Sequence, residues 1–466
     1  MTFHLIHYVT TQRGEGTLIW MLNIGAEKYW NRVQAGINDP NENRLVNRVE
    51  EMNILLCREQ DILILREQPD AAFISRMREY GFSIPRILTP SQADPLTPIA
   101  ELVLQDSALM EQLKILADSR EDVCFVPYAV TALEEQIAEA CGLRMMGASS
   151  VLHASVNDKI MNRRMAEELG FPITEGKVCT SIEEIREAYE RLTAEAPFFT
   201  KVIIKEPHGA SGKGLYIVDH ESKLAPLLSR FSRVLRSSPD SQWIVEGWHE
   251  KSADVNYQIY VAPDGTVDVF SIKQQILRET VYIGSKMPPT LSEGILQAYH
   301  EYGQKIGAYL YALGYTGIAG IDSIITSEGT IVPIIEINGR FTLSTYISFL
   351  QGVLGESKVF SRYFRVHSDR QINYQELCAL LDHTGILYDS SRGEGVILYT
   401  AGSLPIHRDE SSSTYTGRMF ALIVSQDWQT NERIHTQLEK IVDDLAHTNR
   451  NVMNVHLAGE KEAAQA

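Results

Sequence analysis

The sequence has few cysteines and comparatively little positive charge. Its five cysteines, spread over 466 residues, form no CxxC pair, which indicates reduced, buried thiols rather than a disulfide framework or a zinc site. Lys and Arg number 43 against 60 Asp and Glu, so the net charge is −17. Such a charge repels phosphate backbones, and the sequence shows no compensating basic patch. We therefore expect no nucleic-acid partner.

Long apolar runs are also lacking. No stretch approaches the roughly 18 apolar residues that would span a membrane. The first residues, MTFHLIHYVTTQRGEG, do not show the basic region and apolar run of a signal peptide. We therefore expect a cytoplasmic protein without a membrane partner. The chain length and a hydrophobic fraction of 44% predict two to four globular domains.

The first 150 residues alternate between short apolar runs and charged helical stretches. The runs NILLC (53–57), DILILR (61–66) and EDVCFVPY (121–128) are typical of buried strands. Charged stretches such as ALEEQIAEACG (132–142) lie between them and have helical spacing. This alternation predicts a mainly parallel sheet covered by helices.

The rest of the chain changes character twice. Strands and helices alternate up to about residue 250, strands dominate from 253 onward, and two strand-like runs followed by an amphipathic helix occur beyond about 365. We expect an α/β and α+β multidomain protein. The expected domains are 1–150, 151–250, 251–365 and 366–466.

One glycine-rich loop follows a strand that ends in a lysine, in KVIIKEPHGASGKG (201–214). Its glycines let the backbone approach a ligand, and successive N–H groups there can hold phosphate oxygens. The loop is not a Walker A motif, because Lys213 precedes a glycine and a strand rather than Ser or Thr and a helix. It is also no dinucleotide fingerprint. The pattern favours a flap between antiparallel strands, with Lys205 reaching toward phosphates.

A second segment, GIDSIITSEGTIVPIIEINGR (320–340), reads as a β-hairpin with polar ends. A three-residue loop at 327–329 would place Asp322 opposite Ile334, and Gly320 opposite Glu336. Asp322, Glu336 and Asn338 would then share one face of the sheet. Oxygen ligands of this kind suit Mg²⁺, which also takes phosphate oxygens and water. For Asp322 considered alone, a solvent-facing polar strand end is the favoured interpretation. For Asp322, Glu336 and Asn338 together, the metal site is favoured.

The order of these elements resembles the ATP-grasp superfamily. It runs from NDK, a helix and GFP (157–172) to the strand, lysine and glycine loop, then to WIVEGW (243–248), and ends at GID and EINGR. The resemblance covers about 155–350, and E-x-N-x-R is its most specific part. It implies an ATP-grasp fold in which two α+β subdomains, 151–250 and 251–365, clasp ATP. It also implies a Rossmann-like pre-ATP-grasp domain at 1–150 and a small α+β module after 365.

The resemblance also implies roles for individual residues. Lys159 and Lys205 would contact ATP phosphates, and the flap at 209–214 would close over them. Residues 243–248 would grip adenine, with Glu246 at its edge, and Asp254 would bind the ribose. The implied ATP-binding set is Lys159, Lys205, Gly209, Ser211, Gly212, Gly214, Glu246, Gly247, Trp248 and Asp254.

Metal and catalytic positions follow in the same way. Asp322, Glu336 and Asn338 match the metal ligands of the family, which hold Mg²⁺ or, in its place, Mn²⁺. Arg340 matches the position that holds the substrate carboxylate or its acyl phosphate. Lys213 and Arg278 are further candidate catalytic residues, although exposure of Arg278 to solvent is an equal alternative.

The implied reaction is ATP-dependent ligation. A small-molecule carboxylate, of an amino acid or a natural-product precursor, would become an acyl phosphate and then join an amine. A carrier-protein thiol as acceptor, a small-molecule kinase and a non-catalytic nucleotide-binding module are the alternatives. The substrates and any homo-oligomer stay open.

Overall fold

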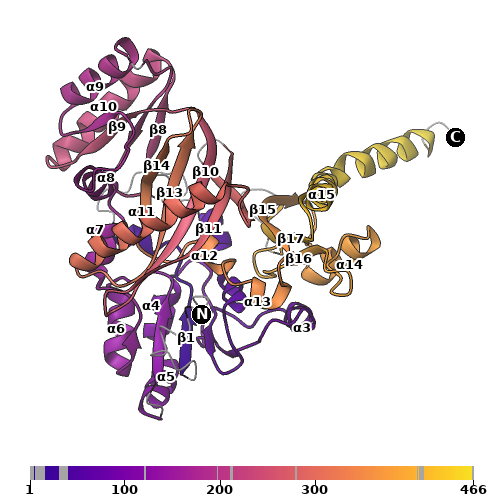
Figure 1. The fold of residues 1–466 in the computed structure, drawn as a ribbon. Helices are drawn as coiled ribbons and strands as arrows, with labels where there is room; N and C mark the ends of the chain where they lie inside the picture. The colour runs from indigo at the N-terminus through magenta and orange to yellow at the C-terminus, as the bar shows by residue number, and fades with distance from the viewer. Residues whose placement is uncertain are drawn as a thin grey trace.

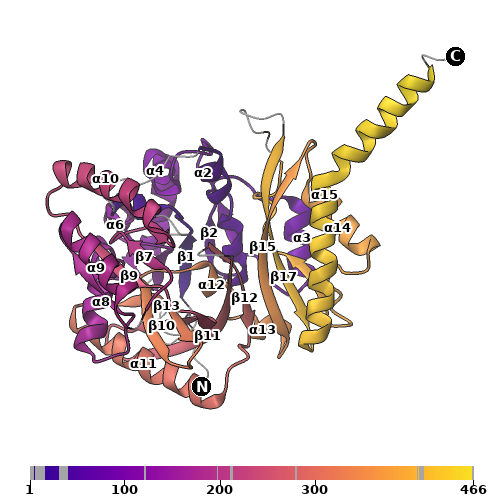
Figure 2. The same cartoon turned by 90° about the horizontal axis from the view of Figure 1, so that it is seen from above.

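The computed structural model describes residues 16–30, 40–119, 122–196, 198–209, 214–278, 281–406 and 414–463, together with Leu5 and Arg408. Within these residues the strands form three sheets, of five, four and eight strands. Figure 2 shows the four-stranded sheet and helix α15 (Trp428–Ala463) at opposite ends of the molecule, with the eight-stranded sheet between them.

The N-terminal part is built on the five-stranded sheet, whose strands are all parallel, in the order β3-β2-β1-β4-β5. This confirms the parallel sheet that the sequence predicts. The strands are β1 (Thr17–Met21), β2 (Ile62–Ile64), β3 (Arg86–Leu88), β4 (Val123–Pro127) and β5 (Arg144–Met145). The helices are η1 (Ala26–Tyr29), α2 (Pro40–Val46), η2 (Glu50–Leu55), α3 (Ala71–Glu79), α4 (Ile99–Gln105), α5 (Ser107–Ser119), α6 (Ala132–Cys141) and α7 (Ser150–Val156).

A small subdomain follows, built on the four-stranded antiparallel sheet in the order β6-β9-β7-β8. Helix α8 leads into it, and the Asp158 side chain caps that helix by accepting the N–H groups of Ile160 and Met161. Its elements are α8 (Lys159–Glu168), β6 (Gly176–Cys179), α9 (Ile182–Ala194), β7 (Val202–Lys205), β8 (Leu215–Val218), α10 (Glu221–Ser237) and β9 (Trp243–Gly247). Figure 1 shows α9 and α10 on the outer side of this sheet.

The eight-stranded antiparallel sheet joins the core of the molecule to its C-terminal module. Its order is β14-β13-β10-β11-β12-β15-β17-β16. The strands are β10 (Lys251–Val261), β11 (Val267–Arg278), β12 (Val281–Met287), β13 (Gly317–Thr326), β14 (Ile331–Asn338), β15 (Lys358–Ser368), β16 (Gly395–Leu398) and β17 (Tyr415–Ser425). The associated helices are α11 (Glu293–Ala312), α12 (Leu343–Tyr346), α13 (Gln351–Leu354), α14 (Tyr374–His383) and α15. The expected domain boundary at 365/366 lies inside β15, which pairs with β12 on one side and β17 on the other.

The C-terminal module also packs against the N-terminal domain. One apolar cluster contains residues of both, and Phe73 of α3 meets Tyr374 of α14 edge-on, with ring centroids 5.3 Å apart. The buried carboxylate of Glu51 accepts the backbone N–H groups of Ala401 and Gly402, the latter at 2.9 Å. Glu51 therefore links two parts of the chain that are 350 residues apart.

We expect the Glu51→Gln variant to alter how stability depends on pH. Burial raises the pKa of Glu51 from 4.5 to about 7. Between these values the folded chain holds a proton that the unfolded chain has lost, so this group stabilises the fold below pH 4.5, and its contribution is lost as the pH rises through 7. Glutamine does not titrate. The melting temperature of Glu51→Gln, relative to the unsubstituted chain, should therefore be higher at pH 7.5 than at pH 5. Thermal unfolding at both pH values, with the exposed Glu79→Gln as control, measures this difference, and the opposite trend would contradict it.

All five cysteines are buried and free, which agrees with the reduced thiols that the sequence predicts. A search of the described helices finds none with the length and apolarity that crossing a bilayer requires.

Candidate active site

A cavity of about 1620 Å³ lies where the N-terminal domain, the small subdomain, the core strands and the C-terminal module meet. Typical ligand pockets occupy roughly 300–1,000 Å³. The candidate residues that line it come from separate elements: Lys159 from α8, Lys205 from β7, Asp322 from β13 and Glu336 from β14. The cavity therefore has room for more than a nucleotide and one small substrate.

The β13–β14 hairpin places the two candidate metal-binding carboxylates side by side. Its three-residue turn is as expected, with Gly329 at φ +86 and the backbone N–H of Thr326 donating to the carbonyl of Thr330 at 2.9 Å. The predicted register is wrong by two residues, because Asp322 faces Glu336 rather than Ile334, and Gly320 faces Asn338 rather than Glu336.

The register shift arises from a bulge in β14. Residues 333–335 there face Ser323 alone, and Pro333 has no N–H group to donate to the ladder. The Ser323 hydroxyl instead donates to the carbonyl of Val332 at 2.8 Å. Since the side-chain period of a strand is two, an insertion of two residues leaves the faces unchanged. Asp322, Glu336 and Asn338 therefore still share one face, as predicted.

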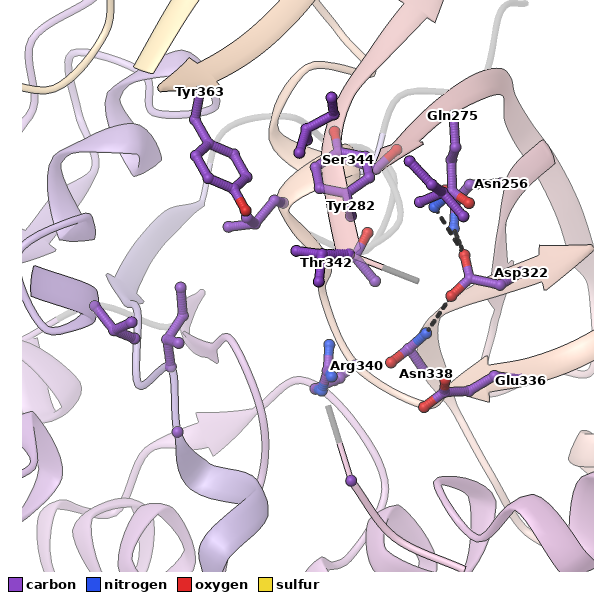
Figure 3. Close-up of a pocket in the computed structure, with 18 of the residues that line it drawn as sticks. Asn256, Gln275, Tyr282, Asp322, Glu336, Asn338, Arg340, Thr342, Ser344 and Tyr363 are labelled. Atoms are coloured by element: carbon purple, nitrogen blue, oxygen red, sulfur yellow. Dashed lines mark hydrogen bonds between the residues drawn. The ribbon is translucent and has the colours of Figure 1, made fainter. Parts of the chain in front are cut away.

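Asp322 lies at the centre of a hydrogen-bond network, which Figure 3 shows. Its Oδ1 accepts Asn256 Nδ2 at 2.8 Å and Gln275 Nε2 at 3.0 Å, and its Oδ2 accepts Asn338 Nδ2 at 3.1 Å. Burial raises the pKa of Asp322, and the negative charge of Glu336 raises it further. The hydrogen bonds from the Asn256 and Gln275 amides act in the opposite direction, and the resulting pKa is about 6. A cation placed between the two carboxylates would relieve this cost.

The side-chain donors at this site are too few to fill the coordination shell of a metal ion by themselves. They fit a magnesium ion that takes its remaining ligands from phosphate and water. Among the described residues no cluster of three or more His, Cys, Asp and Glu side chains is positioned to hold a metal. Asp322 and Glu336 supply two carboxylates, and Asn338 adds an amide. Mg²⁺ typically takes one or two carboxylates and completes its shell with phosphate oxygens and water.

Lys159, the first residue of α8, connects the small subdomain to this acidic pair. Its Nζ lies 2.9 Å from Glu336 Oε1 and donates to the carbonyl of Gly209 at 3.0 Å. Its side chain is 3% exposed. The lysine therefore contacts both a candidate metal ligand and the first residue of the glycine loop.

Lys205, at the end of β7, is held by a buried ion-pair network. Its Nζ lies 2.6 Å from Glu246 Oε2, and the other oxygen of Glu246 lies 2.7 Å from Arg163 Nη1. Burial alone would raise the pKa of Glu246, but the positive charges of Lys205 and Arg163 hold it below its usual value. The Glu246 carboxylate thus fixes the lysine, which differs from the adenine-edge role implied for that side chain by the resemblance.

Arg340 lies near the base of this face and is 6% exposed. Its Nη1 donates to the Tyr128 hydroxyl at 2.9 Å and to the carbonyl of Phe341 at 3.0 Å. The N-terminal domain therefore helps to position a candidate catalytic residue of the core. Arg278, the other candidate that is described, lies at the exposed end of β11 and also lines the cavity.

The remaining predicted residues divide into two groups. Six line the same cavity, and Asp254 among them pairs with Lys251 at 2.6 Å. These six are Gly209, Gly214, Glu246, Gly247, Trp248 and Asp254. Ser211, Gly212 and Lys213 lie outside the described residues.

Sequence reasoning did not identify Arg163, Asn256, Gln275 and Tyr128 as parts of this site. A signal existed for Asn256, because Asp254, Asn256 and Gln258 alternate with apolar residues and so share a face of β10. No such signal marks Arg163, whose partner Glu246 is 83 residues away.

Family models match three parts of the chain. Residues 49–143 match the pre ATP-grasp domain, 164–343 the ATP-grasp domain and 376–438 the PGM1 C-terminal domain. These matches fall on the five-stranded sheet, on the parts that hold the candidate site, and on the C-terminal module.

Two curated relatives align over most of the chain. A [butirosin acyl-carrier protein]–L-glutamate ligase of Niallia circulans is 28% identical over 334 residues, which are 71% of this chain and 73% of that protein. An L-propargylglycine–L-glutamate ligase of Streptantibioticus cattleyicolor is 22% identical over 355 residues, which are 68% and 72%.

Solved structures share the fold at low identity. The biotin carboxylase domain of the Hydrogenobacter thermophilus 2-oxoglutarate carboxylase, solved with MgADP, ADP and bicarbonate, has a TM-score of 0.54 at 13% identity and covers 91% of this chain and 89% of its own. The N5-carboxyaminoimidazole synthase of Aspergillus clavatus, with ADP and a ribonucleotide, has a TM-score of 0.51 at 12% identity and covers 92% and 98%.

The chain is therefore a member of the ATP-grasp superfamily, with a pre-ATP-grasp domain ahead of its ATP-grasp domain and a further module behind it. Within that superfamily it is an ATP-dependent ligase.

Proposed function

We propose that this ligase uses ATP and Mg²⁺ to convert an amino-acid carboxylate into an acyl phosphate, and then transfers the acyl group to an amine. The observation that carries the proposal is the shared face of Asp322, Glu336 and Asn338, which meets Lys159 beside the glycine loop. A site that combines cations for phosphates with oxygen ligands for a metal suits phosphoryl transfer, where positioning and charge stabilisation dominate.

Each residue then has a defined task. Lys159 and Lys205 bind ATP phosphates. Asp322, Glu336 and Asn338 would hold Mg²⁺, which offsets the negative charge of the phosphates when bound. Arg340 orients the substrate carboxylate.

For binding of the adenine, we assign a larger role to main-chain atoms than to the Glu246 side chain. The Glu246 carboxylate is engaged by Lys205 and Arg163. The N–H groups of Gly247 and Trp248 donate to the carbonyls of Glu175 and Lys201, each at 2.9 Å, so the main-chain carbonyl groups of these two residues are the better candidates for the adenine edge. Trp248 and Asp254 both line the cavity. We assign Asp254 to the ribose.

The reaction proceeds in two steps, phosphoryl transfer followed by acyl transfer. A carboxylate oxygen attacks the γ-phosphorus, the bond to the β-phosphate oxygen breaks, and ADP leaves. The acceptor nitrogen then attacks the acyl carbon, the C–N bond forms, the C–O bond to phosphate breaks, and the amine proton is released. Residues around the cavity would exclude water that would otherwise hydrolyse the acyl phosphate.

We further propose that an acidic amino acid such as L-glutamate is one substrate. Both curated relatives are named as L-glutamate ligases. The cavity also contains several arginines although the chain carries a net charge of −17. They are Arg66, Arg278, Arg340, Arg362, Arg365 and Arg418. Guanidinium groups match carboxylates with two parallel hydrogen bonds.

A thiol acceptor is the second candidate. It is favoured by one observation, the carrier-protein substrate named for the Niallia circulans relative. Formation of the acyl phosphate would be identical, and only the attacking atom would differ.

A hydroxylamine trap tests the proposal without knowledge of the natural acceptor. The full chain with ATP, Mg²⁺, L-glutamate and hydroxylamine should release one phosphate for each glutamyl hydroxamate, measured by a phosphate assay and product mass. Screening other amino acids in the same assay identifies the acid if glutamate is inactive. Release of AMP, or accumulation of a stable phosphorylated product, would contradict an acyl phosphate ligase. Replacing hydroxylamine with amines or with a carrier protein then separates the two acceptors.

A further inference from the structure

Lys273 of β11 is a buried cation that none of the roles described above uses. Its side chain is 0% exposed, and no carboxylate among the described residues forms an ion pair with it. Burial lowers the pKa of Lys273 from 10.5 to about 7. Removing an ammonium group from water without a counter-ion costs free energy. The lysine therefore lowers the stability of the fold, and its presence calls for an explanation other than stability.

The position of Lys273 in the sheet relates it to the candidate metal site. Lys273 lies opposite Asn256 of β10, and Asn256 lies opposite Asp322 of β13. Directly opposed residues of antiparallel strands share one face, so Lys273 is on the face that carries the candidate metal ligands. Two strand spacings, or about 10 Å, separate it from Asp322. Lys273 is not part of the cavity lining, so any effect on a substrate must pass through another residue.

The hydrogen bonds of Lys273 lead to the segment that follows the candidate metal strand. Its Nζ donates to Ser348 Oγ at 2.7 Å and also to Ser271 Oγ on its own strand. Ser348 Oγ donates in turn to the carbonyl of Ser344 at 3.1 Å. Both Ser344 and Ser348 belong to residues 342–348, which contain α12 and which we call the 342–348 turn. Lys273 therefore holds this turn through two hydrogen bonds in series.

A second buried side chain holds the beginning of the 342–348 turn. Gln258 of β10 is 0% exposed. Its Nε2 donates to Thr342 Oγ1 at 3.1 Å, and its Oε1 accepts Thr345 Oγ1 at 2.8 Å. Polar side chains beneath the turn, from β10 and β11, therefore fix it at both ends.

The 342–348 turn forms part of the cavity wall. It supplies Thr342, Leu343 and Ser344 to the lining. In the view of Figure 3, Thr342 and Ser344 lie above Arg340. The Ser344 hydroxyl is buried and has no hydrogen-bond partner in the part of the chain that the structure describes. Buried polar groups normally have a partner, so this hydroxyl is available to a polar group of a ligand.

We propose that Lys273 is a positioning residue which, through Ser348, holds the 342–348 turn in the shape that receives the substrate acid. This inference rests on the proposed ligase function. Arg340, which we assign to the substrate carboxylate, lies two residues before the turn, so a displaced turn would misplace the same substrate. A cation that lowers stability is thus used for substrate binding, which is a common trade-off at functional sites.

The test measures KM for the acid in the hydroxylamine trap, with the full chain and saturating ATP. Lys273→Met removes the charge and both hydrogen bonds but fills a similar volume. KM for L-glutamate, or for the acid that the trap identifies, should rise at least tenfold. KM for ATP and kcat should change less than threefold, because the nucleotide site is built on other elements. The melting temperature should not fall, because an unpaired buried charge is removed.

The two hydrogen-bond partners of the lysine provide matched variants. Ser348→Ala should reproduce the rise in KM for the acid. Ser271→Ala leaves the contact with the turn intact and should keep this KM within twofold. The double variant Lys273→Met/Ser348→Ala should be no worse than Lys273→Met alone, since both changes break the same contact. The serine variants decide the question even if Lys273→Met does not fold.

Four outcomes would overturn the inference. They are an unchanged KM for the acid in Lys273→Met or in Ser348→Ala, equal effects of Ser348→Ala and Ser271→Ala, fully additive effects in the double variant, and a lower melting temperature of Lys273→Met with a parallel rise in KM for ATP. The last would assign the lysine to stability alone. If the unsubstituted chain forms the hydroxamate, each of these outcomes rejects only the role of Lys273. If it forms none with any acid, the proposed function is rejected, and this inference with it.

Discussion

Replacing Glu336 with glutamine should lower kcat for phosphate release by at least a hundredfold while leaving the fold intact. The substitution keeps the shape of the side chain but removes one of the two carboxylate charges that face each other across β13 and β14. A hundredfold loss corresponds to about 2.7 kcal/mol of transition-state stabilisation. Lys159 loses its charged partner at 2.9 Å but keeps the carbonyl of Gly209. We therefore expect the lysine to stay in place.

The matched control for this variant lies on the same hairpin. Glu328→Gln makes the same chemical change at the exposed turn, away from the cavity. It should leave kcat unchanged within twofold. Raising the Mg²⁺ concentration should partly restore Glu336→Gln if the lost charge holds the metal. Near-normal kcat for Glu336→Gln at low Mg²⁺ would contradict the metal assignment.

Replacing Lys205 with methionine should weaken nucleotide binding by at least tenfold, or about 1.4 kcal/mol. Methionine keeps most of the length of the side chain but removes the charge that we assign to ATP phosphates. Arg163 still neutralises the Glu246 carboxylate at 2.7 Å, so the small subdomain should stay folded. Calorimetry with Mg²⁺ and a non-hydrolysable ATP analogue measures the loss.

Lys201→Met is the comparison for this second prediction. Lys201 is exposed and immediately precedes the same strand, β7. Its loss should leave the affinity for the nucleotide unchanged. If both variants bound the analogue as tightly as the unsubstituted chain, Lys205 would serve only to neutralise Glu246.

Local patterns were sufficient to predict much of the site. The turn at 327–329 and the period of two along a strand placed Asp322, Glu336 and Asn338 on one face. The predicted register was nevertheless wrong, because the bulge at Pro333 leaves two carbonyl groups without partners in the ladder. The Ser323 hydroxyl donates to the carbonyl of Val332, and the Tyr257 hydroxyl donates to the carbonyl of Pro333, each at 2.8 Å. Tyr257 belongs to β10, so its contribution is not readable from the sequence of the hairpin.

Contacts between distant segments account for what the sequence did not reveal. The pairing of β12 with β15 makes the C-terminal module part of the core sheet, and nothing in the sequence of either strand specifies that partner. The same holds for Arg163 with Glu246, and for Lys273 with Ser348, because each pair is brought together only by tertiary structure.

The pairing of β15 with β12 has a consequence for the integrity of the core itself. Residues 284–287 of β12 lie opposite residues 359–362 of β15. A chain that ended before β15 would leave this row of backbone donors and acceptors open to water and to other molecules. An exposed edge strand of this kind can pair with strands of other chains to form intermolecular sheets. By pairing β15 with β12, the C-terminal module thus also covers an edge strand that would otherwise promote aggregation.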